Sequence, residues 1–442
     1  MQKLKVMIDG YNLGLEKGTG VATYARNLSY CLHDLGHEVS VLYGGKAAPG
    51  TTDLMKEIAF FDSNAGDIPK WLRNLRAMHE VFYGPLGYAA EKVPITGRVI
   101  ADTFKPWLPY FDSIWNSKDL FRRSHNAFKM FNQLGRVHLN HKPDIAHWTY
   151  PLPLFIKGAK NIYTLHDLVP LRLPYTTLDN KRRYLRLCSQ IAKRADHIVT
   201  VSETSRKDII DLLGVHPDRV TNTYQAVTIP AKYKDKPIEV VKREVEGTFG
   251  LVFRGYFLFF GSIEPKKNIG RLIEAYLGSD IETPLVIVGA QAWKSEQELR
   301  LLYEDHIRSL IKVGDETRVK RRVIQLDYAP FPLLVSLIRG AKATLFPSLY
   351  EGFGLPVLES MMLGTPVMSS KVSSIPEVVG DAACLVNPYD TREMAEAIRA
   401  LDKNEELRTE LSVRGKMQAQ QFDESAYQKR LDAVYSRVIK GS

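Results

Sequence analysis

Residues 351–359 read EGFGLPVLE, and this stretch decides the fold. The apolar run ATLFPS (343–348) precedes it, and PVLESMML (356–363) has a helical pattern with a proline in its first turn. The pattern predicts a strand, a glycine loop and a helix, and open α/β sheets bind ligands at such strand ends. Free amides of the loop can bind phosphate oxygens, and Glu351 and Glu359 can accept hydrogen bonds from sugar hydroxyls. A simpler interpretation makes the glycines turn residues and Glu359 an ordinary first-turn acid.

The rest of the chain repeats this alternation of strands and helices. LKVMID (4–9) has the pattern of a buried strand, VATYARNLSYCLHDL (21–35) that of a helix, and HEVSVLYG (37–44) that of the next strand. This βαβ order predicts a parallel sheet. A second strand series begins with YFLFFGS (256–262), after a polar segment at 228–247 that we take as the domain boundary. The sequence therefore predicts an α/β protein with two Rossmann-like domains that face a cleft.

Composition narrows the class of protein without identifying a partner. The 442 residues are 45% hydrophobic and 25% charged, which is ordinary for a globular chain of two or three domains. The three cysteines show no metal or disulfide spacing, and no signal peptide is visible, so we expect a reducing cytoplasm. No run approaches the ~20 apolar residues that a membrane span needs. The net charge of +10 suits a nucleotide sugar, nucleic acid or a membrane surface, and does not choose among them.

The stretch EGFGLPVLE resembles the signature of the retaining glycosyltransferases of family 4, which are built on the two-Rossmann (GT-B) scaffold. Three further segments are similar to motifs of this family: GTGVATYARNL (18–28), LHD (165–167) and GSIEPKKN (261–268). The similarity covers nearly the whole chain except roughly residues 50–140. The resemblance implies the GT-B fold class and an enzyme that uses a nucleotide sugar.

The same resemblance implies how the domains are arranged. An N-terminal acceptor domain is expected over residues 1–228, completed by a C-terminal helix over about 424–442 that crosses back to it. The donor domain, which binds the nucleotide sugar, is expected over residues 248–423. Residues 65–142 form a divergent insert in the first domain, where acceptor specificity would be expected.

The insert is basic and aromatic. It holds 12 Lys/Arg against 6 Asp/Glu, and three of the five tryptophans, Trp71, Trp107 and Trp115. KDLFRRSHNAFKMFNQL (118–134) places Phe128 and other apolar residues near one helical face, flanked by basic residues. Such a helix can lie on an anionic membrane. Alternatively, the aromatic face packs into the first domain and the charges are solvated.

The resemblance also assigns the phosphate contacts. Lys267 is implied to bind the donor diphosphate, where a fixed cation offsets the charge on the leaving nucleotide, and Lys266 can share this role. The family often has arginine where this chain has Ser262, so the phosphate contacts here differ from the usual clamp. Two adjacent lysines could also be ordinary surface charges, but these two follow a strand end and Gly261.

The sugar contacts are assigned in the same way. Glu351 is implied to contact the transferred sugar, Glu359 to hold the ribose hydroxyls, and His166 to contact the sugar near the leaving phosphate. Asp167 either caps the following segment or touches sugar or acceptor, and we interpret His147 as structural. The predicted catalytic residues are His166, Glu351 and Lys267. The predicted donor-binding residues are Gly20, Ser262, Lys266, Lys267, Gly289, Phe353, Gly354, Leu355 and Glu359.

The resemblance implies transfer of a hexosyl group to a growing or lipid-linked bacterial surface glycan such as lipopolysaccharide. The first donor expected is GDP-mannose, which supplies mannose. No cofactor or metal is expected, because no HxxxH, cysteine pair or Asp-x-Asp motif is suitably placed. We expect no nucleic-acid partner, and a cytoplasmic protein with a peripheral position on the inner face of the plasma membrane as an option. Two alternatives remain open: a sugar-nucleotide 2-epimerase on the same fold, and a non-catalytic basic protein that binds membrane or nucleic acid.

Overall fold

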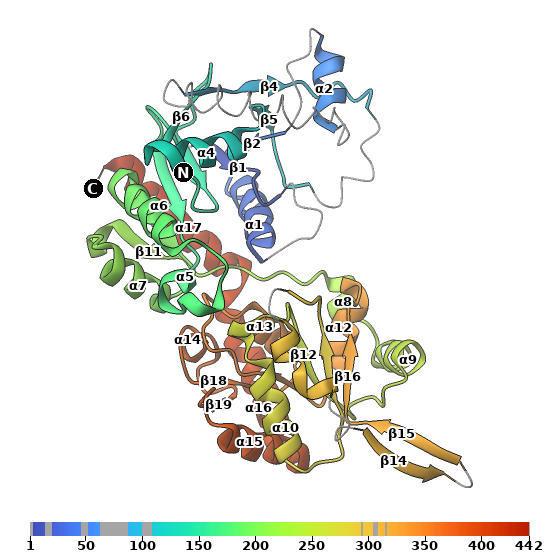
Figure 1. The fold of residues 1–442 in the computed structure, drawn as a ribbon. Coiled ribbons are helices and arrows are strands. Elements are labelled where there is room, and N and C mark those ends of the chain that lie inside the picture. The colour runs from blue at the N-terminus through green and yellow to red at the C-terminus, as the bar shows by residue number, and fades with distance from the viewer. Residues whose placement is uncertain are drawn as a thin grey trace, which may run out of the picture.

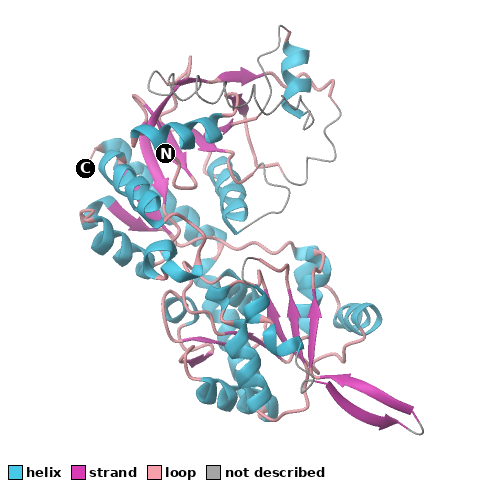
Figure 2. Cartoon of the chain, in the orientation of Figure 1, coloured by secondary structure: helices cyan, strands magenta, loops and turns pink. Residues whose placement is uncertain are grey.

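The computed structural model describes residues 3–13, 20–45, 52–61, 87–99, 108–292, 295–303, 308–313 and 316–441. The fold is the predicted α/β fold, with two Rossmann-like domains that each carry a mainly parallel sheet covered by helices (Figures 1 and 2). Trp71 and Trp107 lie outside the described residues.

The first sheet has the strand order β11-β10-β9-β7-β1-β2-β5-β4. Its neighbouring strands pair in parallel except β4 with β5, which are antiparallel. The central strands are buried apolar runs, as parallel sheets covered on both faces require. The strand bounds are β1 Lys5–Asp9, β2 Glu38–Tyr43, β4 Glu91–Val93, β5 Ser113–Asn116, β7 Ile145–Trp148, β9 Lys160–Thr164, β10 His197–Thr200 and β11 Val220–Asn222.

Helices from distant parts of the chain cover this sheet. The last helix, α17, lies against α1 of the first domain, so the chain returns to the domain in which it began (Figure 1). A small sheet with the order β3-β6-β8 adds to this domain. The bounds are α1 Gly20–Asp34, α2 Asp53–Phe61, β3 Tyr88–Ala89, α4 Leu120–Phe131, β6 Gly135–His138, β8 Leu154–Ile156, α5 Val169–Arg172, α6 Lys181–Arg194, α7 Glu203–Leu213 and α17 Glu424–Lys440.

The second sheet has the order β16-β13-β12-β17-β18-β19, and all its pairs are parallel. A two-stranded hairpin, β14-β15, projects from this domain (Figure 1). The strand bounds are β12 Phe257–Phe260, β13 Leu285–Val288, β14 Arg308–Val313, β15 Glu316–Arg321, β16 Val323–Leu326, β17 Ala343–Phe346, β18 Val367–Ser370 and β19 Cys384–Val386. The helix bounds are α8 Ala231–Lys234, α9 Ile238–Phe249, α10 Ile269–Gly278, α11 Ser295–Glu298, α12 Phe331–Gly340, α13 Leu355–Met362, α14 Ile375–Val379, α15 Thr391–Lys403 and α16 Glu405–Ala419.

The segment between the two sheets is more ordered than the predicted boundary at 228–247 suggests. It contains α9, whose Val241 and Val245 are fully buried in a core cluster with Tyr256 and Leu258 of the second domain. Valines four residues apart lie on one face of a helix, which gives this charged segment an apolar side. The second domain therefore begins before residue 248.

The aromatic face of α4 packs inward. Phe128 is 3% exposed and Trp115 on β5 is 5% exposed, and both belong to the core cluster of the first domain. Of the two interpretations of this helix, the structure shows the one in which its aromatic residues are core. Phe128 is therefore not available to lipid, whereas the charged side chains of α4 and Met130, which is 62% exposed, remain at the surface.

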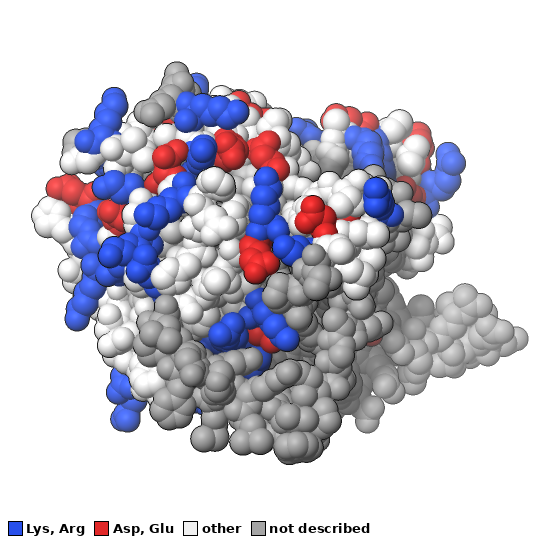
Figure 3. Space-filling view, turned by 90° about the horizontal axis from the view of Figure 1, so that it is seen from above, with Lys and Arg blue, Asp and Glu red and all other residues white. Residues whose placement is uncertain are grey.

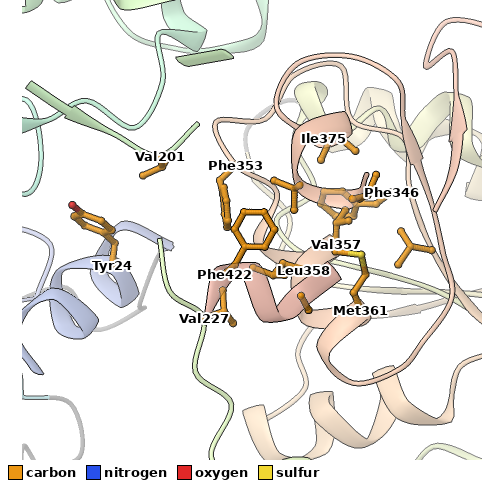
Figure 4. Close-up of a cluster of buried hydrophobic side chains, with 14 of the residues drawn as sticks. Tyr24, Val201, Val227, Phe346, Phe353, Val357, Leu358, Met361, Ile375 and Phe422 are labelled. Carbon is orange, nitrogen blue, oxygen red and sulfur yellow. The ribbon is translucent and has the colours of Figure 1, made fainter. Parts of the chain in front are cut away.

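A continuous apolar contact joins the two domains (Figure 4). The ring of Phe353 packs edge-on against Phe422, with centroids 5.5 Å apart, and Tyr224 packs 5.2 Å from Phe422. The carboxylate of Glu377 in the second domain accepts hydrogen bonds from the N–H groups of Glu203 (2.8 Å) and Thr204 (3.0 Å) at the start of α7. These contacts fix the orientation of the two strand-end edges that face each other.

Candidate active site

A buried ion pair lies where the second sheet faces the first domain. Lys267 ends a short 3-10 turn (Pro265–Lys267) after β12, and Glu351 follows β17. The Nζ atom of Lys267 is 2.7 Å from Oε1 of Glu351, with only 10% and 8% of the two side chains exposed. The ammonium group also lies 4.8 Å from the ring centre of Phe346. The EGFG loop (351–354) and the loop that carries Lys267 therefore contact each other through these two side chains.

Neighbouring charges keep the Glu351 carboxyl ionised. Burial alone would raise the pKa of the Glu351 carboxyl, but Lys267 and Lys266 outweigh it and hold that pKa below its ordinary value. Burial likewise opposes the charge on Lys266, but Glu351, Asp167 and Glu264 outweigh it and raise the pKa of that lysine. The site therefore holds two cations in a poorly solvated place, where they act most strongly on an anionic ligand.

The hydroxyl groups of Ser373 and Ser374, which precede α14, hold the EGFG loop in place. The Oγ atom of Ser374 lies 2.9 Å from the carbonyl oxygens of both Glu351 and Phe353, and Ser373 Oγ accepts from the N–H of Glu351 at 3.0 Å. Gly354 has a φ of 107°, and a Cβ there would lie 2.6 Å from Ile375 Cδ1. The two serines are site-shaping residues that the sequence did not single out.

The side chain of Phe353 does not face a ligand. It is buried in the interdomain core against Phe422 (Figure 4). If Phe353 contacts a donor as predicted, the contact has to come from its main chain, because the side chain is in this core.

Glu359 is partly exposed on α13, and no described residue forms a hydrogen bond with its carboxylate. Burial raises its pKa from 4.5 to about 7. Because no described residue donates a hydrogen bond to this carboxylate, hydroxyl groups of a ligand could donate to it and stabilise its charged form.

Two glycines have a steric reason for their identity. A Cβ on Gly289 would lie 1.8 Å from the carbonyl oxygen of Gly261, so the ends of β12 and β13 could not approach as they do. Close packing of these strand ends therefore requires glycine here, whether or not a nucleotide binds. A Cβ on Gly20 would lie 3.1 Å from Cδ1 of Leu355, which places the first turn of α1 against the first residue of α13. Ser262 is exposed and bonds to Glu264 at 3.1 Å.

His166 belongs to the first domain and faces a cavity that Lys266 of the second domain also lines. Its Nε2 is 3.0 Å from the carbonyl oxygen of Thr149, and its ring lies edge-on to Tyr24 at 4.8 Å. Burial lowers its pKa, so the imidazole is neutral. Because a carbonyl can only accept, the proton is on Nε2, and Nδ1 is left as an acceptor for a hydroxyl.

Asp9 holds Thr149, whose carbonyl oxygen meets this histidine, and the sequence did not reveal this indirect connection. Its buried carboxylate, at the end of β1, accepts from the N–H groups of Thr149 and Tyr11. Burial raises the pKa of Asp9 to about 6, although these hydrogen bonds oppose the shift. An aspartate that directly ends a buried strand, as in KVMID, was the available signal.

His147 belongs to a buried network that reaches Tyr24, the residue whose ring also packs against His166. Its Nδ1 is 2.6 Å from the hydroxyl of Tyr435 on α17, and its Nε2 is 2.8 Å from Oγ1 of Thr164. Thr164 in turn lies 3.0 Å from the hydroxyl of Tyr24. Burial lowers the pKa of His147 to about 3, so it stays neutral. This supports the structural interpretation of His147.

A cavity of about 460 Å³ joins the two sides of the site. His166 and Lys266, both singled out from the sequence, line it from opposite domains. The other predicted catalytic and donor-binding residues do not line it, and these include Lys267, Glu351 and Glu359. The full lining is Val21, Tyr150, Pro151, His166, Asp167, Val169, Pro170, Thr176, Thr177, Leu178, Asp179, Tyr184, Glu264 and Lys266.

Two further observations concern the described residues only. Within them, no three His, Cys, Asp or Glu side chains are grouped so that they could hold a metal ion. None of the described helices combines the length and the apolar character needed to cross a membrane.

Two family models match the chain, "Glycosyltransferase Family 4" over residues 18–228 and "Glycosyl transferases group 1" over residues 254–418. The chain is 34% identical over 269 residues to O-antigen chain mannosyltransferase B of Escherichia coli, which covers 59% of this chain and 66% of that protein. It is 28% identical over 287 residues to the serotype-specific mannosyltransferase WbdA of Escherichia coli, which covers 62% of this chain and 33% of that protein. The chain thus spans between one third and two thirds of the length of these relatives.

Among solved structures, sucrose-phosphate synthase from Thermosynechococcus elongatus superposes with a TM-score of 0.66 at 15% identity, over 100% of both chains. At this identity the likeness shows the shared fold.

Proposed function

Since this chain belongs to the family 4 glycosyltransferases, we propose that it transfers a hexosyl group from a nucleotide sugar to a growing bacterial surface glycan, with retention of configuration. Mannose from GDP-mannose is the first donor to test, because the names of two Escherichia coli relatives specify mannosyl transfer. The observation that carries the proposal is that Lys266, which lies beside the buried Lys267–Glu351 pair, lines one cavity together with His166.

The geometry suits an anionic leaving group. Lys266 and Lys267 would hold the donor diphosphate, and their charge would offset the negative charge that grows as the bond between sugar and phosphate breaks. Glu351, released from part of its contact with Lys267, would accept a hydroxyl of the transferred sugar. Nδ1 of His166 would accept another, and Glu359 would accept from the ribose hydroxyls. No metal is needed for this charge balance, because the two lysines supply it.

The transfer step forms one bond and breaks one at the same sugar carbon. The acceptor oxygen bonds to this carbon on the face that the diphosphate leaves, and the acceptor proton passes to the departing phosphate oxygen. No enzyme nucleophile is required, and the family 4 signature favours this route. The role of the protein is to hold donor and acceptor together and to stabilise the leaving group.

We further propose a cytoplasmic protein that attaches peripherally to an anionic inner leaflet, where a lipid-linked acceptor would lie. The net charge of +10 supports this, and clusters of Lys and Arg are visible on the upper face of the first domain (Figure 3). Because the aromatic face of α4 is core, the attraction would come from surface charge. Each Lys or Arg near such a leaflet contributes ~1 kcal/mol.

The proposal is tested by following nucleotide-sugar turnover with and without candidate glycans. A glycosyltransferase joins the sugar to an added acceptor and releases the nucleoside diphosphate. A 2-epimerase would change the sugar without any acceptor, and a non-catalytic binding protein would turn over neither. A panel of labelled donors, beginning with GDP-mannose, separates these outcomes.

A further inference from the structure

We propose that the cavity in front of His166 binds an uncharged, hydroxyl-rich sugar unit of the acceptor through Asp167 and Asp179, and excludes acceptors that carry a phosphate at this position. The inference rests on the proposed function, because it concerns the second substrate of the same reaction. It assigns the acceptor's chemical class to residues of the first domain outside the 65–142 insert.

The size and walls of the cavity suit a sugar. Its volume of about 460 Å³ falls in the usual range for small-ligand sites. Tyr150 forms part of the wall, and its ring is stacked at 5.5 Å on Tyr11, which holds it in place. Pro151, Val169 and Leu178 add apolar surface. An aromatic and apolar wall can pack against the C–H face of a pyranose ring while polar groups bind its hydroxyls.

Asp167 has a free oxygen close to the donor side. Its Oδ1 accepts from the N–H of Val169 at 3.1 Å, which leaves Oδ2 for a ligand. Oδ2 lies 3.0 Å from the point that a Cβ on Gly352 would occupy, so this carboxylate adjoins the EGFG loop. A hydroxyl bound by Asp167 is therefore held next to the loop that we expect to contact the transferred sugar.

Asp179 supplies a second carboxylate at the exposed rim of the cavity, and no described residue forms an ion pair with it. It follows the short 3-10 turn Pro174–Thr176, and the nearby Lys181 directs its ammonium group to the carbonyl oxygen of Thr177. Asp179 can therefore accept hydrogen bonds from hydroxyls without displacing a protein cation.

The charge of the lining disfavours an anionic acceptor. Three lining residues are carboxylates, Asp167, Asp179 and Glu264, and the single lining cation among the described residues is Lys266. That lysine is 3.5 Å from Glu264 and would also hold the donor diphosphate. With the donor bound, a phosphate in the cavity would meet several negative charges and no spare cation. Specificity by such repulsion is a common device.

The test compares methyl α-mannoside with mannose 6-phosphate and mannose 1-phosphate as acceptors, at a saturating concentration of the donor found by the panel. The wild type should use the neutral sugar with a kcat/KM at least tenfold above that of either phosphate. Asp179→Asn should raise KM for the neutral sugar severalfold, and Asp179→Lys should shift the neutral-to-phosphate ratio about tenfold toward the phosphates. The matched control is Asp218→Lys, whose side chain is 87% exposed and does not line the cavity.

Two readouts separate this inference from the proposed function. Donor binding measured by calorimetry does not need an acceptor, so its absence would contradict the proposed function itself. Ligand-observed NMR detects acceptor binding without turnover, and saturation transfer to methyl α-mannoside that weakens in Asp179→Asn would support the inference. With donor binding intact, a preference for a phosphorylated acceptor, or acceptor ratios that Asp179→Lys leaves unchanged, would overturn it.

Discussion

The ammonium group of Lys267 and the carboxylate of Glu351 lie 2.7 Å apart, although 84 residues separate them in the chain. Each comes from a loop that follows a parallel strand of the second sheet, and both side chains are about nine-tenths buried. The pair thus connects the loop expected to bind phosphate with the loop expected to bind sugar. Its disruption should affect stability and function in separable ways.

Lys267→Ala should lower the free energy of unfolding by about 3–5 kcal/mol, because it leaves Glu351 charged and buried without its partner. The double variant Lys267→Met, Glu351→Gln should recover most of this stability, since both charges are gone. Neither variant should bind the nucleotide sugar as the wild type does. Urea unfolding and calorimetry measure the two effects. Recovery of donor binding in the double variant would show that the lysine is structural only.

Glu359→Ala should weaken donor binding by ~1.5–3 kcal/mol, the range for hydrogen bonds to a charged group, while the fold survives. Because burial raises the pKa of Glu359 to about 7, wild-type affinity should rise between pH 6 and pH 8 as the carboxylate ionises. Glu359→Gln should remove this part of the pH dependence. Calorimetry at several pH values measures it, and an unchanged nucleotide affinity in Glu359→Ala would reject the assignment.

The same residue should affect stability with the opposite dependence on pH. A carboxyl whose pKa rises from 4.5 to about 7 on folding stabilises the fold below its unfolded value, and this contribution is lost as pH rises through about 7. Glu359→Gln should therefore be more stable than the wild type at pH 8, by at most ~3 kcal/mol at ~1.4 kcal/mol per pKa unit. At pH 4 the two proteins should unfold alike. A lower stability of the glutamine variant at pH 8 would contradict the partly buried, unpartnered environment of the Glu359 carboxylate.

Gly289→Ala should destabilise the second domain by about 1–3 kcal/mol, because the new methyl group meets the carbonyl of Gly261 and the strand ends must separate. Gly20→Ala is the matched control, since its methyl group would meet only the flexible end of Leu355. Thermal unfolding compares the two. Equal melting temperatures for Gly289→Ala and the wild type would show that the strand ends relax freely.

Activity should persist in excess EDTA, because Lys266 and Lys267 supply the positive charge at the diphosphate. Product release measured with and without the chelator tests this. Complete loss of turnover that magnesium or manganese restores would show that our charge balance at the site is wrong.

Membrane attachment should depend on exposed charge and fall with salt. Arg182, Arg183 and Arg186 on α6 are exposed, whereas Arg122 on α4 already pairs with Asp119 at 3.1 Å. Replacing the three α6 arginines by glutamine should reduce binding to anionic vesicles by about two decades, at ~1 kcal/mol per charge. Co-sedimentation with anionic and neutral vesicles is the measurement. Equal pelleting of variant and wild type would exclude α6 as the contact.

The strands and helices of both domains could largely be predicted, because parallel-sheet strands are continuous apolar runs and their helices have clear periodicity. LKVMID and ATLFPS became β1 and β17, and PVLESMML became α13. The burial of α4's aromatic face could not be decided in advance, because an amphipathic helix has the same pattern against a core as against lipid. The hairpin β14-β15 is a local pairing in a basic segment, and that segment carries only weak alternation.

At the site, residue types and loops could be predicted, and contacts could not. The roles of Asp9 and Thr149 behind His166 depend on which strands are neighbours, and β1 pairs with β7 across more than a hundred residues. The core position of Phe353 depends on the terminal segment that brings Phe422 to it. Sequence motifs name the groups that can do chemistry, whereas tertiary packing decides which of them are free to do it.

The central claim is that this chain transfers a sugar to an acceptor hydroxyl with retention, and NMR of the product tests it most directly. The protein is incubated with GDP-mannose and a mannosyl acceptor, and the anomeric coupling of the new linkage is read as it forms. The account predicts an α-linked product from the α-configured donor, formed only when acceptor is present and lost in Lys267→Ala. A β-linked product, or conversion of the donor sugar without acceptor, would contradict it.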